Sequence, residues 1–405
     1  MDGERIIGDL MGPQGRADPY PLYRRAHALG PAVAAGEGAV LVSGYHEVNQ
    51  VLRSTAFRVP DAVLRERWEE GFLDHSSKTL FSRSILETNA PDHARMRSLI
   101  ASVFTARRVA ALEPAVRAAV AELLDDLAEA GTGGEPVDFM DAFAFRLPVG
   151  VICELLGVPK QDRYRFRPLA SDLTAALEIL VSDEELTAAD RAADELAGYF
   201  TELAARRAAE PADDLVSALV RVAAEDPGRI AGRELLANLV LLLVAGFETT
   251  TNLLGNGLAL LFDHPAELAA LREGRLPAAG LVDEVLRHDS PVQLTSRISL
   301  DDELSAGGVP TPYGTALFLL IGAANRDPSR YPDPDRFDPY RTDSQPLSFG
   351  AGAHFCLGAQ LARQEAVVAM PELLRRFPGL APAGERTRTD RLVLRGYRTL
   401  PVTLG

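Results

Sequence analysis

The stretch that decides the fold is residues 348–363, SFGAGAHFCLGAQLAR. It places Cys356 between a glycine-rich loop and an apolar run that favours a helix. A thiol at a helix N-terminus faces backbone N–H groups, and these groups and the nearby His354 favour its thiolate form. The stretch therefore predicts a thiolate that ligates a metal or acts as a nucleophile. The alternative is a buried structural thiol, which we expect for the other cysteine, Cys153.

Composition excludes several classes of protein. The chain has 405 residues, 47% of them hydrophobic, with a net charge of −15 and two cysteines. Two cysteines cannot build a disulfide scaffold, and they are too few for a four-thiolate zinc or iron–sulfur site in one chain. The acidic balance, without a Lys/Arg-rich block, argues against nucleic acid as a partner.

The N-terminus and the apolar segments bear on location. The first residues lack the basic and then apolar layout of a signal peptide. The longest apolar stretch, residues 239–247, is far shorter than the ~20 residues that span a bilayer. We therefore expect a cytoplasmic protein without a membrane segment, and we take a monomer as the default because no feature of the sequence indicates an oligomer.

Most of the chain is predicted to be helical. Apolar residues recur at three- and four-residue spacing over residues 109–128 and 188–207, which is typical of amphipathic helices. Short apolar runs flanked by Gly or Pro predict strands in roughly residues 30–60 and 292–322, and in the C-terminal tail. The proline-dense segment 327–341 predicts a long loop. We expect a mostly α fold in which the whole chain forms one domain with a smaller β-rich part.

One predicted helix, residues 231–262, is long enough to cross the domain, since 32 residues at ~1.5 Å each give roughly 48 Å. Its apolar pattern breaks at residues 245–251, AGFETTT, which are poor choices for a helix interior. One interpretation is a local distortion in which Thr hydroxyls bond back to carbonyls. The other is a helix opened beside a cavity, with Glu248 and Thr249 facing a ligand, because such departures cluster at functional sites.

The cysteine loop also carries a family signature. Residues 349–358 follow the pattern Phe-x-x-Gly-x-His-x-Cys-x-Gly, which resembles the haem-ligand loop of cytochrome P450 enzymes. Four further segments resemble motifs of this family in the family's order, so the resemblance covers nearly the whole chain. They are HARMR at 93–97, AGFET at 245–249, EVLR at 284–287 and PDRF at 334–337. The resemblance implies the cytochrome P450 fold, with haem b between the long central helix and the cysteine loop, and it is strongest to soluble actinobacterial members that tailor natural products.

The resemblance assigns residues to the cysteine side of the haem. Cys356 is implied to be the axial thiolate ligand of the iron, which favours O–O bond cleavage. Phe349 and the backbone at Gly350 are implied to surround its sulfur. Four side chains are implied to pair with the two haem propionates: His93, Arg97, Arg297 and His354.

On the opposite face, the resemblance implies that Ala245 borders the haem and that Thr249 and Glu248 are catalytic. Thr249 is suited to hydrogen-bond to dioxygen or to an ordered water, and Glu248 is suited to relay protons from solvent. Because this acid–alcohol pair is present, we expect dioxygen activation with external electrons. A further set is implied to form a buried structural ion network: Glu284, Arg287 and Arg336.

The substrate pocket is implied to lie above the haem, with a mostly apolar wall in which Gln293 is an orienting group. The candidates are Leu241, Val244, Ala245, Val292, Gln293, Leu294 and Tyr397. Residues 61–83, which the resemblance places over the pocket, are unusually charged. They form either a solvated helix or a surface that recognises a polar substrate or a carrier protein.

The favoured hypothesis is a haem-thiolate monooxygenase that hydroxylates or epoxidises a small organic substrate. The resemblance points to a polyketide, macrolide or peptide intermediate of secondary metabolism, free or carrier-bound. One alternative keeps the haem centre but catalyses oxidative coupling or another non-hydroxylating oxidation. Another is a non-catalytic haem- or metabolite-binding protein, in which the pair Glu248 and Thr249 has no evident purpose.

The electron donors are expected to be separate proteins. The chain shows no sign of a flavin or iron–sulfur module, so we expect a ferredoxin and a ferredoxin reductase to supply electrons. An acidic partner of this kind requires positive charge on the Cys356 side despite the net charge of −15. The candidates for that surface are Arg107, Arg108 and Arg363.

Overall fold

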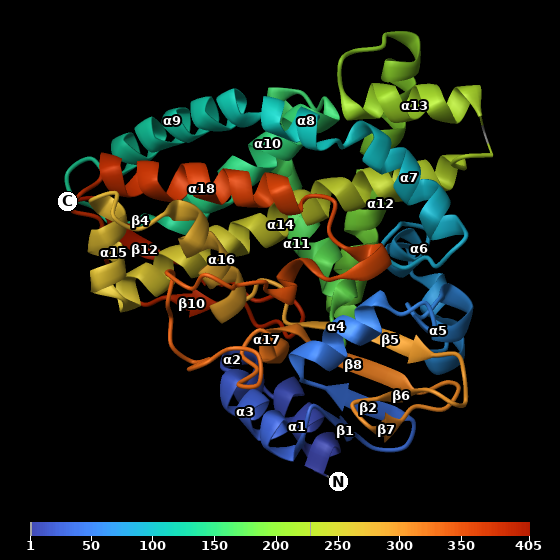
Figure 1. The fold of residues 1–405 in the computed structure, drawn as a ribbon. Helices are drawn as coiled ribbons and strands as arrows, with labels where there is room; N and C mark the ends of the chain where they lie inside the picture. The colour runs from blue at the N-terminus through green and yellow to red at the C-terminus, as the bar shows by residue number, and fades with distance from the viewer. Residues whose placement is uncertain (1, 227) are drawn as a thin grey trace.

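The computed structural model describes residues 2–226 and 228–405. A five-stranded sheet and the N-terminal helices occupy one end of the molecule, and a helical body makes up the rest (Figure 1). The strand order is β1-β2-β8-β5-β3, in which only the β2–β8 pair is parallel. The strands are β1 (Ala32–Ala34), β2 (Ala39–Val42), β3 (Phe57–Arg58), β5 (Leu294–Ser299) and β8 (Ala316–Leu320).

The sheet is covered on both faces. In the central strand β8, Leu317 and Leu319 pack with α4 (Tyr45–Arg53), whereas Leu320 packs with the N-terminal helices. Successive side chains of a strand face opposite sides, so one strand contributes to two apolar cores. The N-terminal helices are α1 (Asp2–Met11), α2 (Pro13–Ala17) and α3 (Tyr20–Leu29).

The helical body is built around α14 (Gly232–Asp263), which crosses the molecule (Figure 1). Gly246 in α14 has a packing reason, because a Cβ there would lie 2.6 Å from Cγ1 of Ile152 in α10. The helices in contact with α14 are α10 (Arg146–Leu156), α12 (Asp183–Ala209), α13 (Leu215–Glu225), α15 (Pro265–Arg272), α16 (Ala278–His288) and α18 (Ala359–Arg376), together with α6 and α11 below.

Further helices and short elements complete the fold. The helices are α5 (Ala62–Trp68), α6 (Ser76–Ser82), α7 (Asp92–Val103), α8 (Ala106–Ala111), α9 (Glu113–Ala130), α11 (Phe166–Thr174) and α17 (Ile321–Ala324). Short helical turns are η1 (Phe72–Asp74), η2 (Met140–Ala144), η3 (Lys160–Arg165), η4 (Ala175–Leu177), η5 (Leu347–Phe349) and η6 (Gly352–His354). Short strands are β4 (Val137–Asp138), β6 (Ser305–Ala306), β7 (Val309–Pro310), β9 (Ala381–Pro382), β10 (Thr387–Arg388), β11 (Tyr397–Thr399) and β12 (Pro401–Thr403).

The predicted fold class, mostly α with a smaller β-rich part, is confirmed. The central helix lies within one residue of the predicted 231–262, and segment 327–341 contains no helix or strand. The helix predicted over residues 109–128 is instead two helices, α8 and α9. Their junction is at Leu112, directly before a helix whose first turn contains proline, a residue that favours helix starts because it lacks an N–H.

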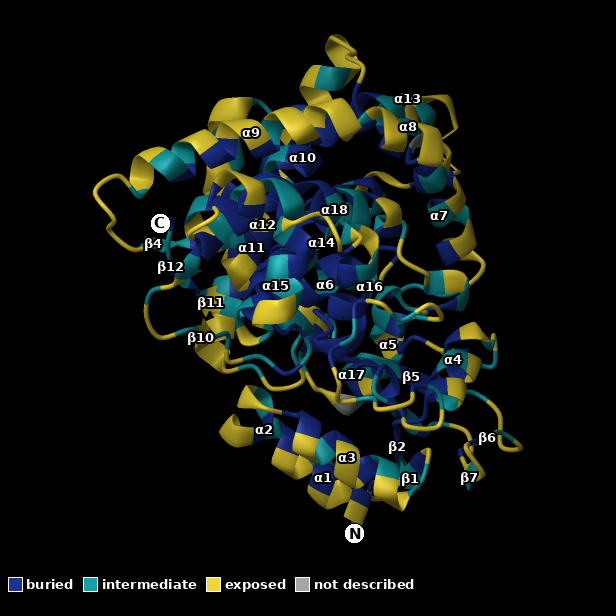
Figure 2. Ribbon diagram, turned by 60° about the vertical axis from the view of Figure 1, so that its left-hand side comes forward, coloured by how far each residue is buried: buried dark blue, intermediate teal, exposed yellow. Residues whose placement is uncertain are grey.

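By length and composition, α14 is the one helix in the described residues that could cross a membrane, with a mean hydropathy of 1.4 in its most apolar window. The helix is mostly buried, however, and lies among the other helices of the body (Figure 2). It therefore reads as the core helix of a folded domain, because a helix that is apolar on most of its surface is stable inside a large protein.

Candidate functional site

The cysteine loop owes its shape to two glycines. Gly350 and Gly352 have φ angles of 69° and 68°, a region that side chains with a Cβ rarely adopt. A Cβ at Gly352 would also overlap the carbonyl oxygen of Leu52 at the end of α4. The loop is therefore pressed against α4, and it turns back so that the Cys356 N–H donates to the Phe349 carbonyl at 2.9 Å.

Cys356 lies two residues before Gly358, the N-cap of α18, and so stands at the helix start that the sequence predicts. Its side chain keeps accessible surface. Burial raises the pKa of the Cys356 thiol, whereas the N–H groups of Gly358 and Ala359 and the guanidinium of Arg97 lower it. The loop thus stabilises negative charge on sulfur, although not enough to outweigh burial. A thiolate here is stable when a cation, such as a metal ion, lies against it.

The four side chains that were predicted to pair with the haem propionates lie close together near Cys356. The His93 and His354 ring centroids are 4.1 Å apart, and Arg97 donates to the Phe355 carbonyl at 2.5 Å. Arg297 is buried and donates only to oxygens of its own strand, the Ser296 carbonyl at 2.6 Å and the Thr295 hydroxyl at 3.4 Å. Among the described residues, none of these four groups forms an ion pair with a carboxylate.

We call this set the cationic cluster (His93, Arg97, Arg297 and His354). Its electrostatics indicate a site that suits an anionic group. Burial, then the charges of the other members, lowers the pKa of His354 to about 3, and the pKa of His93 is lowered for the same reasons. Burial lowers the pKa of Arg297 to about 10. Nε2 of His93 is buried without a hydrogen-bond partner. Two guanidinium groups that contact no carboxylate among the described residues, with two imidazoles beside them and a thiol nearby, fit a cofactor that carries a metal ion and two carboxylates, as haem does.

On the opposite side, α14 continues through the unusual segment without a break. The Thr249 hydroxyl donates to the Ala245 carbonyl at 3.2 Å, and the Thr250 hydroxyl donates to the Gly246 carbonyl at 3.5 Å. The interpretation in which Thr hydroxyls bond back to the helix is therefore the one observed, and the expected opening of the helix is absent. Ala245 is nevertheless exposed, although Val244 and Phe247 beside it are buried.

Glu248 lies next to this exposed position, and its side chain is partly accessible. Burial raises its pKa, and the positive charges of Arg391 and Arg167 act against that rise. A carboxyl group with a raised pKa binds a proton more readily than an ordinary carboxyl group does, which suits it to proton transfer. Glu248 is therefore suited to the predicted proton relay.

The predicted structural ion network is correct at Glu284 and Arg287 and wrong at Arg336. Arg287 and Glu284 are buried and lie 2.7 Å apart (Arg287 Nη2 to Glu284 Oε1). Arg336 is exposed and contributes only its carbonyl, which accepts from Arg287 at 2.9 Å. The third charge is Arg341, whose Nε lies 3.5 Å from Glu284 Oε1. Sequence reasoning missed Arg341, which lies five residues further along the same proline-rich segment.

Two of the predicted pocket residues, Gln293 and Leu294, point elsewhere. The Gln293 side chain accepts from the Tyr23 hydroxyl at 2.8 Å and donates to the Ser290 carbonyl at 2.7 Å, so its amide is occupied under the N-terminal helices. Leu294 packs in the same apolar core. Because alternate residues of β5 face opposite sides, Leu294 cannot share the face of Arg297. Leu241 and Val244 are buried in the helical core, and Val292 is partly exposed.

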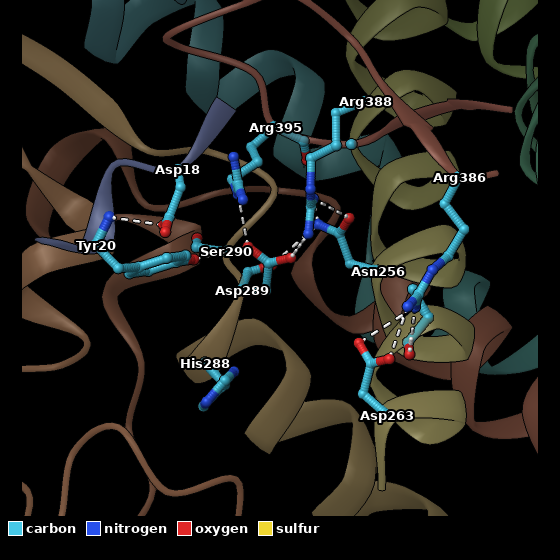
Figure 3. Close-up of polar contacts among 12 residues, drawn as sticks. Asp18, Tyr20, Asn256, Asp263, His288, Asp289, Ser290, Arg386, Arg388 and Arg395 are labelled. Atoms are coloured by element: carbon cyan, nitrogen blue, oxygen red, sulfur yellow. Dashed lines mark hydrogen bonds and ion pairs between the residues drawn. The ribbon is translucent and has the colours of Figure 1, made fainter. Parts of the chain in front are cut away.

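Tyr397 also belongs to a different environment. The Arg388 guanidinium lies over its ring, 4.1 Å from the centroid, and Arg388 is part of a polar network around Asp289 (Figure 3). Asp289 accepts from Arg388 at 2.8 Å, from Arg395 at 2.8 Å and from the Tyr20 hydroxyl at 2.7 Å. This Asp289 network joins the C-terminal tail to α3 and α16, so the role predicted for Tyr397 as a pocket hydroxyl is not supported.

Several charged groups of segment 61–83 are paired or hydrogen-bonded to other groups of the protein. Glu66 accepts from the N–H groups of Gly71 and Leu73 at 3.1 and 2.8 Å. The pairs formed by this segment are Arg65 with Glu87, at 3.0 Å, Lys78 with Glu69, and His75 with Asp190, at 2.7 Å. These contacts favour the solvated helix over a surface built to bind a charged partner.

The comparisons with known proteins agree with this geometry. A sequence model described as Cytochrome P450 matches residues 278–396. The chain is 37% identical to 6-deoxyerythronolide B hydroxylase of Saccharopolyspora erythraea, over 98% of this chain and 99% of that protein. It is 38% identical to the cytochrome P450 monooxygenase PikC of Streptomyces venezuelae, over 97% of this chain and 92% of PikC. The structure of P450BioI, solved with an acyl carrier protein ligated to hexadec-9Z-enoic acid, has a TM-score of 0.87 and 32% identity, over 96% of this chain and 99% of P450BioI.

A cysteine loop beside a cationic cluster, together with a central helix that carries a carboxyl and a hydroxyl group, is the residue set of a haem-thiolate enzyme. The relatives match this chain from end to end rather than at the loop alone. The chain belongs to the cytochrome P450 family of monooxygenases, and its cofactor is haem b. The resemblance stated from the motifs is thus confirmed.

Proposed function

We propose that this monooxygenase hydroxylates or epoxidises a small organic intermediate of secondary metabolism, with Cys356 as the thiolate ligand. The observation that carries the proposal is the cationic cluster beside Cys356, which has no carboxylate partner in the described part of the chain. The relatives named as 6-deoxyerythronolide B hydroxylase and PikC support an oxygenation of this class.

The proposed roles fall into two groups, one on the Cys356 side of the site and one on α14. His93, Arg97, Arg297 and His354 would hold the haem propionates. When bound, the haem supplies the activation of dioxygen, with one oxygen atom inserted into the substrate and the other reduced to water. The Glu248 carboxyl moves protons from solvent toward Thr249. Since the Thr249 hydroxyl donates to Ala245 over a long 3.2 Å contact, it can exchange that bond for one to a ligand.

Turnover with labelled dioxygen tests the reaction class. Candidate substrates are found first, by the spectral change when a compound displaces the iron-bound water. We expect one labelled oxygen atom in the product. A product that contains no label would overturn the monooxygenase proposal and support the alternative of oxidative coupling.

The role of Thr249 is tested by Thr249→Ala, with Thr250→Ala as the matched control. Both hydroxyls bond back to α14, but only Thr249 is proposed to act at the site. We expect Thr249→Ala to lose on the order of tenfold in product formed per electron consumed, and Thr250→Ala to remain near wild type. Equal coupling in the two variants would contradict the assignment.

We propose a ferredoxin and its reductase as electron donors, with docking near Arg107. Arg108 pairs with Asp213 and Arg363 pairs with Asp283, so two of the three predicted cations are partly neutralised. Arg107 is exposed and has no ion pair among the described residues. We expect Arg107→Glu to slow reduction by an acidic ferredoxin more at low salt than at high salt; an unchanged rate would remove Arg107 from the docking surface.

The remaining assignments are also proposals. P450BioI was solved with an acyl carrier protein, which supports a carrier-bound substrate as one possibility to screen. We propose a cytoplasmic monomer that contains one haem domain, because Cys356 and α14 must act together. The buried position of α14 supports this location.

A further inference from the structure

One carboxylate connects the turn between α11 and α12 to a loop near the C-terminus, residues 391–394. Glu178 follows η4, and its Oε2 accepts from the N–H groups of Leu392 and Val393 at 2.8 and 2.9 Å. Its Oε1 accepts from the N–H group of Leu394 at 3.2 Å. Three consecutive backbone donors therefore converge on one side chain more than 200 residues away in sequence.

The base of that loop is fixed independently of Glu178. Leu394 forms an isolated bridge with Val292, directly before β5. Arg395 donates to Asp289 at 2.8 Å and to the carbonyls of Arg16 and Ala17, so it is held in the Asp289 network (Figure 3). Glu178 thus joins the α11–α12 turn to a loop whose base is anchored by other contacts.

The tip of the loop brings a cation toward Glu248. Arg391 donates to the Ser171 carbonyl of α11 at 2.8 Å, and its positive charge acts on both Glu178 and Glu248. Burial raises the pKa of Glu178, and the three N–H donors oppose that rise. The loop held by Glu178 therefore borders the side of the site on which Glu248 lies.

A second carboxylate in the same region, that of Glu185, has an ordinary structural role and serves as a comparison. Glu185 accepts from the N–H and hydroxyl groups of Ser182 at 2.9 and 2.8 Å, and thereby caps α12. It connects residues within one helix start, whereas Glu178 connects two elements that are remote in sequence. Glu185 accepts no hydrogen bond from residues 392–394, so loss of the cap acts directly on the start of α12.

We propose that Glu178 is a positioning residue, whose carboxylate holds residues 391–394 against the α11–α12 turn and thereby controls how small apolar ligands reach the Glu248 side of the site. The ligand-access part of this proposal rests on the proposed haem function. The contact itself does not, since it is formed by the protein alone.

The test compares Glu178→Ala, Glu178→Gln and the control Glu185→Gln in the full-length haem-loaded protein. Hydrogen exchange is followed at the amides of residues 392–394. We expect Glu178→Ala to accelerate exchange there by about tenfold or more, and Glu178→Gln by less, because one amide oxygen can still accept. Glu185→Gln is expected to leave these amides unchanged. Unchanged exchange in Glu178→Ala would overturn the proposal.

The second readout is the association rate of 4-phenylimidazole, used as a small haem-binding probe and followed by its spectral change. We expect association to be several-fold faster in Glu178→Ala, while the spectrum of the reduced, carbon-monoxide-bound protein stays as in the wild type. Faster exchange with an unchanged association rate would overturn the positioning role. A wild-type protein without the thiolate-haem spectrum would instead overturn the proposed function, and the exchange measurement would still decide whether Glu178 holds the loop.

Discussion

Two groups of cations in this molecule differ in whether a carboxylate is present. In the Asp289 network, Arg388 and Arg395 each contact the same buried carboxylate at 2.8 Å (Figure 3). In the cationic cluster near Cys356, the two guanidinium groups donate to backbone carbonyls and one hydroxyl, and to no carboxylate within residues 2–226 and 228–405. Each group combines buried members with half-buried ones: Arg297 and His93 are buried in the cluster, as Asp289 and Arg395 are in the network. Burial alone therefore does not distinguish them.

The difference shows in the pKa shifts. Burial opposes ionisation of Asp289, but Arg388 and Arg395 outweigh burial and hold its pKa far below the ordinary value. In the cationic cluster, burial and mutual repulsion act in the same direction and lower the pKa of His354 to about 3. A self-neutralised network is explained by protein stability, whereas a cluster that is destabilised by its own charges is explained by an anion that it binds.

The largest effect on stability is expected from Asp289→Asn, which leaves the buried Arg395 and the half-buried Arg388 without their carboxylate. We expect the free energy of unfolding to fall by about 3–5 kcal/mol, measured by urea unfolding. Asp390→Asn is the control, since the exposed pair of Asp390 with Arg16 is worth ~1 kcal/mol or less. Equal losses in the two variants would contradict the distinction between buried and exposed networks.

Arg297→Gln in the cationic cluster is expected to leave the stability of the apoprotein nearly unchanged and to weaken the binding of haem. The apoprotein should keep its stability within about 0.5 kcal/mol, because the substitution removes an unpaired buried charge. Haem should be lost faster by roughly tenfold, since a charged partner of the propionates is gone. Haem transfer to an acceptor protein measures this loss, and an apoprotein destabilised as strongly as Asp289→Asn would refute the comparison.

Acid titration sharpens the comparison further. The pKa of His354 is about 3 in the folded protein, below its ordinary value of about 6.5, so between these values the unfolded chain binds the additional proton. The apoprotein should therefore lose stability as pH falls below about 6.5, and His354→Gln should flatten this dependence. Bound haem should also flatten it, because propionates favour the protonated imidazole.

His288 provides the internal control for that titration. Burial and then Arg326 lower its pKa to about 3 as well, but it lies outside the cationic cluster and bonds to the Asp335 carbonyl at 3.1 Å. We expect its contribution to the pH dependence to have the same sign and to be unaffected by haem. Unfolding midpoints from pH 5 to 7, with and without haem, separate the two histidines; a haem effect carried by His288 would contradict the account.

The smallest effect separates Arg341 from Arg336. Arg341→Ala should destabilise the protein by about 1–2 kcal/mol, because it removes a cation beside the buried Glu284. Arg336→Ala should change stability by no more than ~0.5 kcal/mol, since its exposed side chain contributes no ion pair to the network. Thermal unfolding of the two variants tests this, and a larger loss in Arg336→Ala would restore the original assignment.

The sequence was sufficient where a motif has fixed spacing on one element. The Cys356 loop, the pair Glu284 and Arg287, and the central helix were each predicted within a residue. It was insufficient where a loop determines which side chain turns inward. Arg341 rather than Arg336 reaches Glu284 because the proline-rich segment folds back on itself, a path that local pattern does not encode.

The pocket was the least predictable part for a related reason. Whether Gln293 or Leu294 faces the site depends on the register of β5 against β8 and on the helices packed behind the sheet. A one-residue change in register would reverse those faces. The hydrogen bonds from residues 392–394 to the Glu178 carboxylate could likewise not be predicted from the sequence, because their donors are backbone groups more than 200 residues away.

The most direct test of the central claim is the absorption spectrum of the reduced, carbon-monoxide-bound protein. We predict the red-shifted Soret band of thiolate-ligated haem in the wild type and in Cys153→Ala, because burial raises the pKa of Cys153 to about 12 and keeps it from acting as a ligand. We predict that Cys356→Ala lacks the band. A haem-loaded wild type without the band, or a Cys356→Ala variant that retains it, would contradict the account.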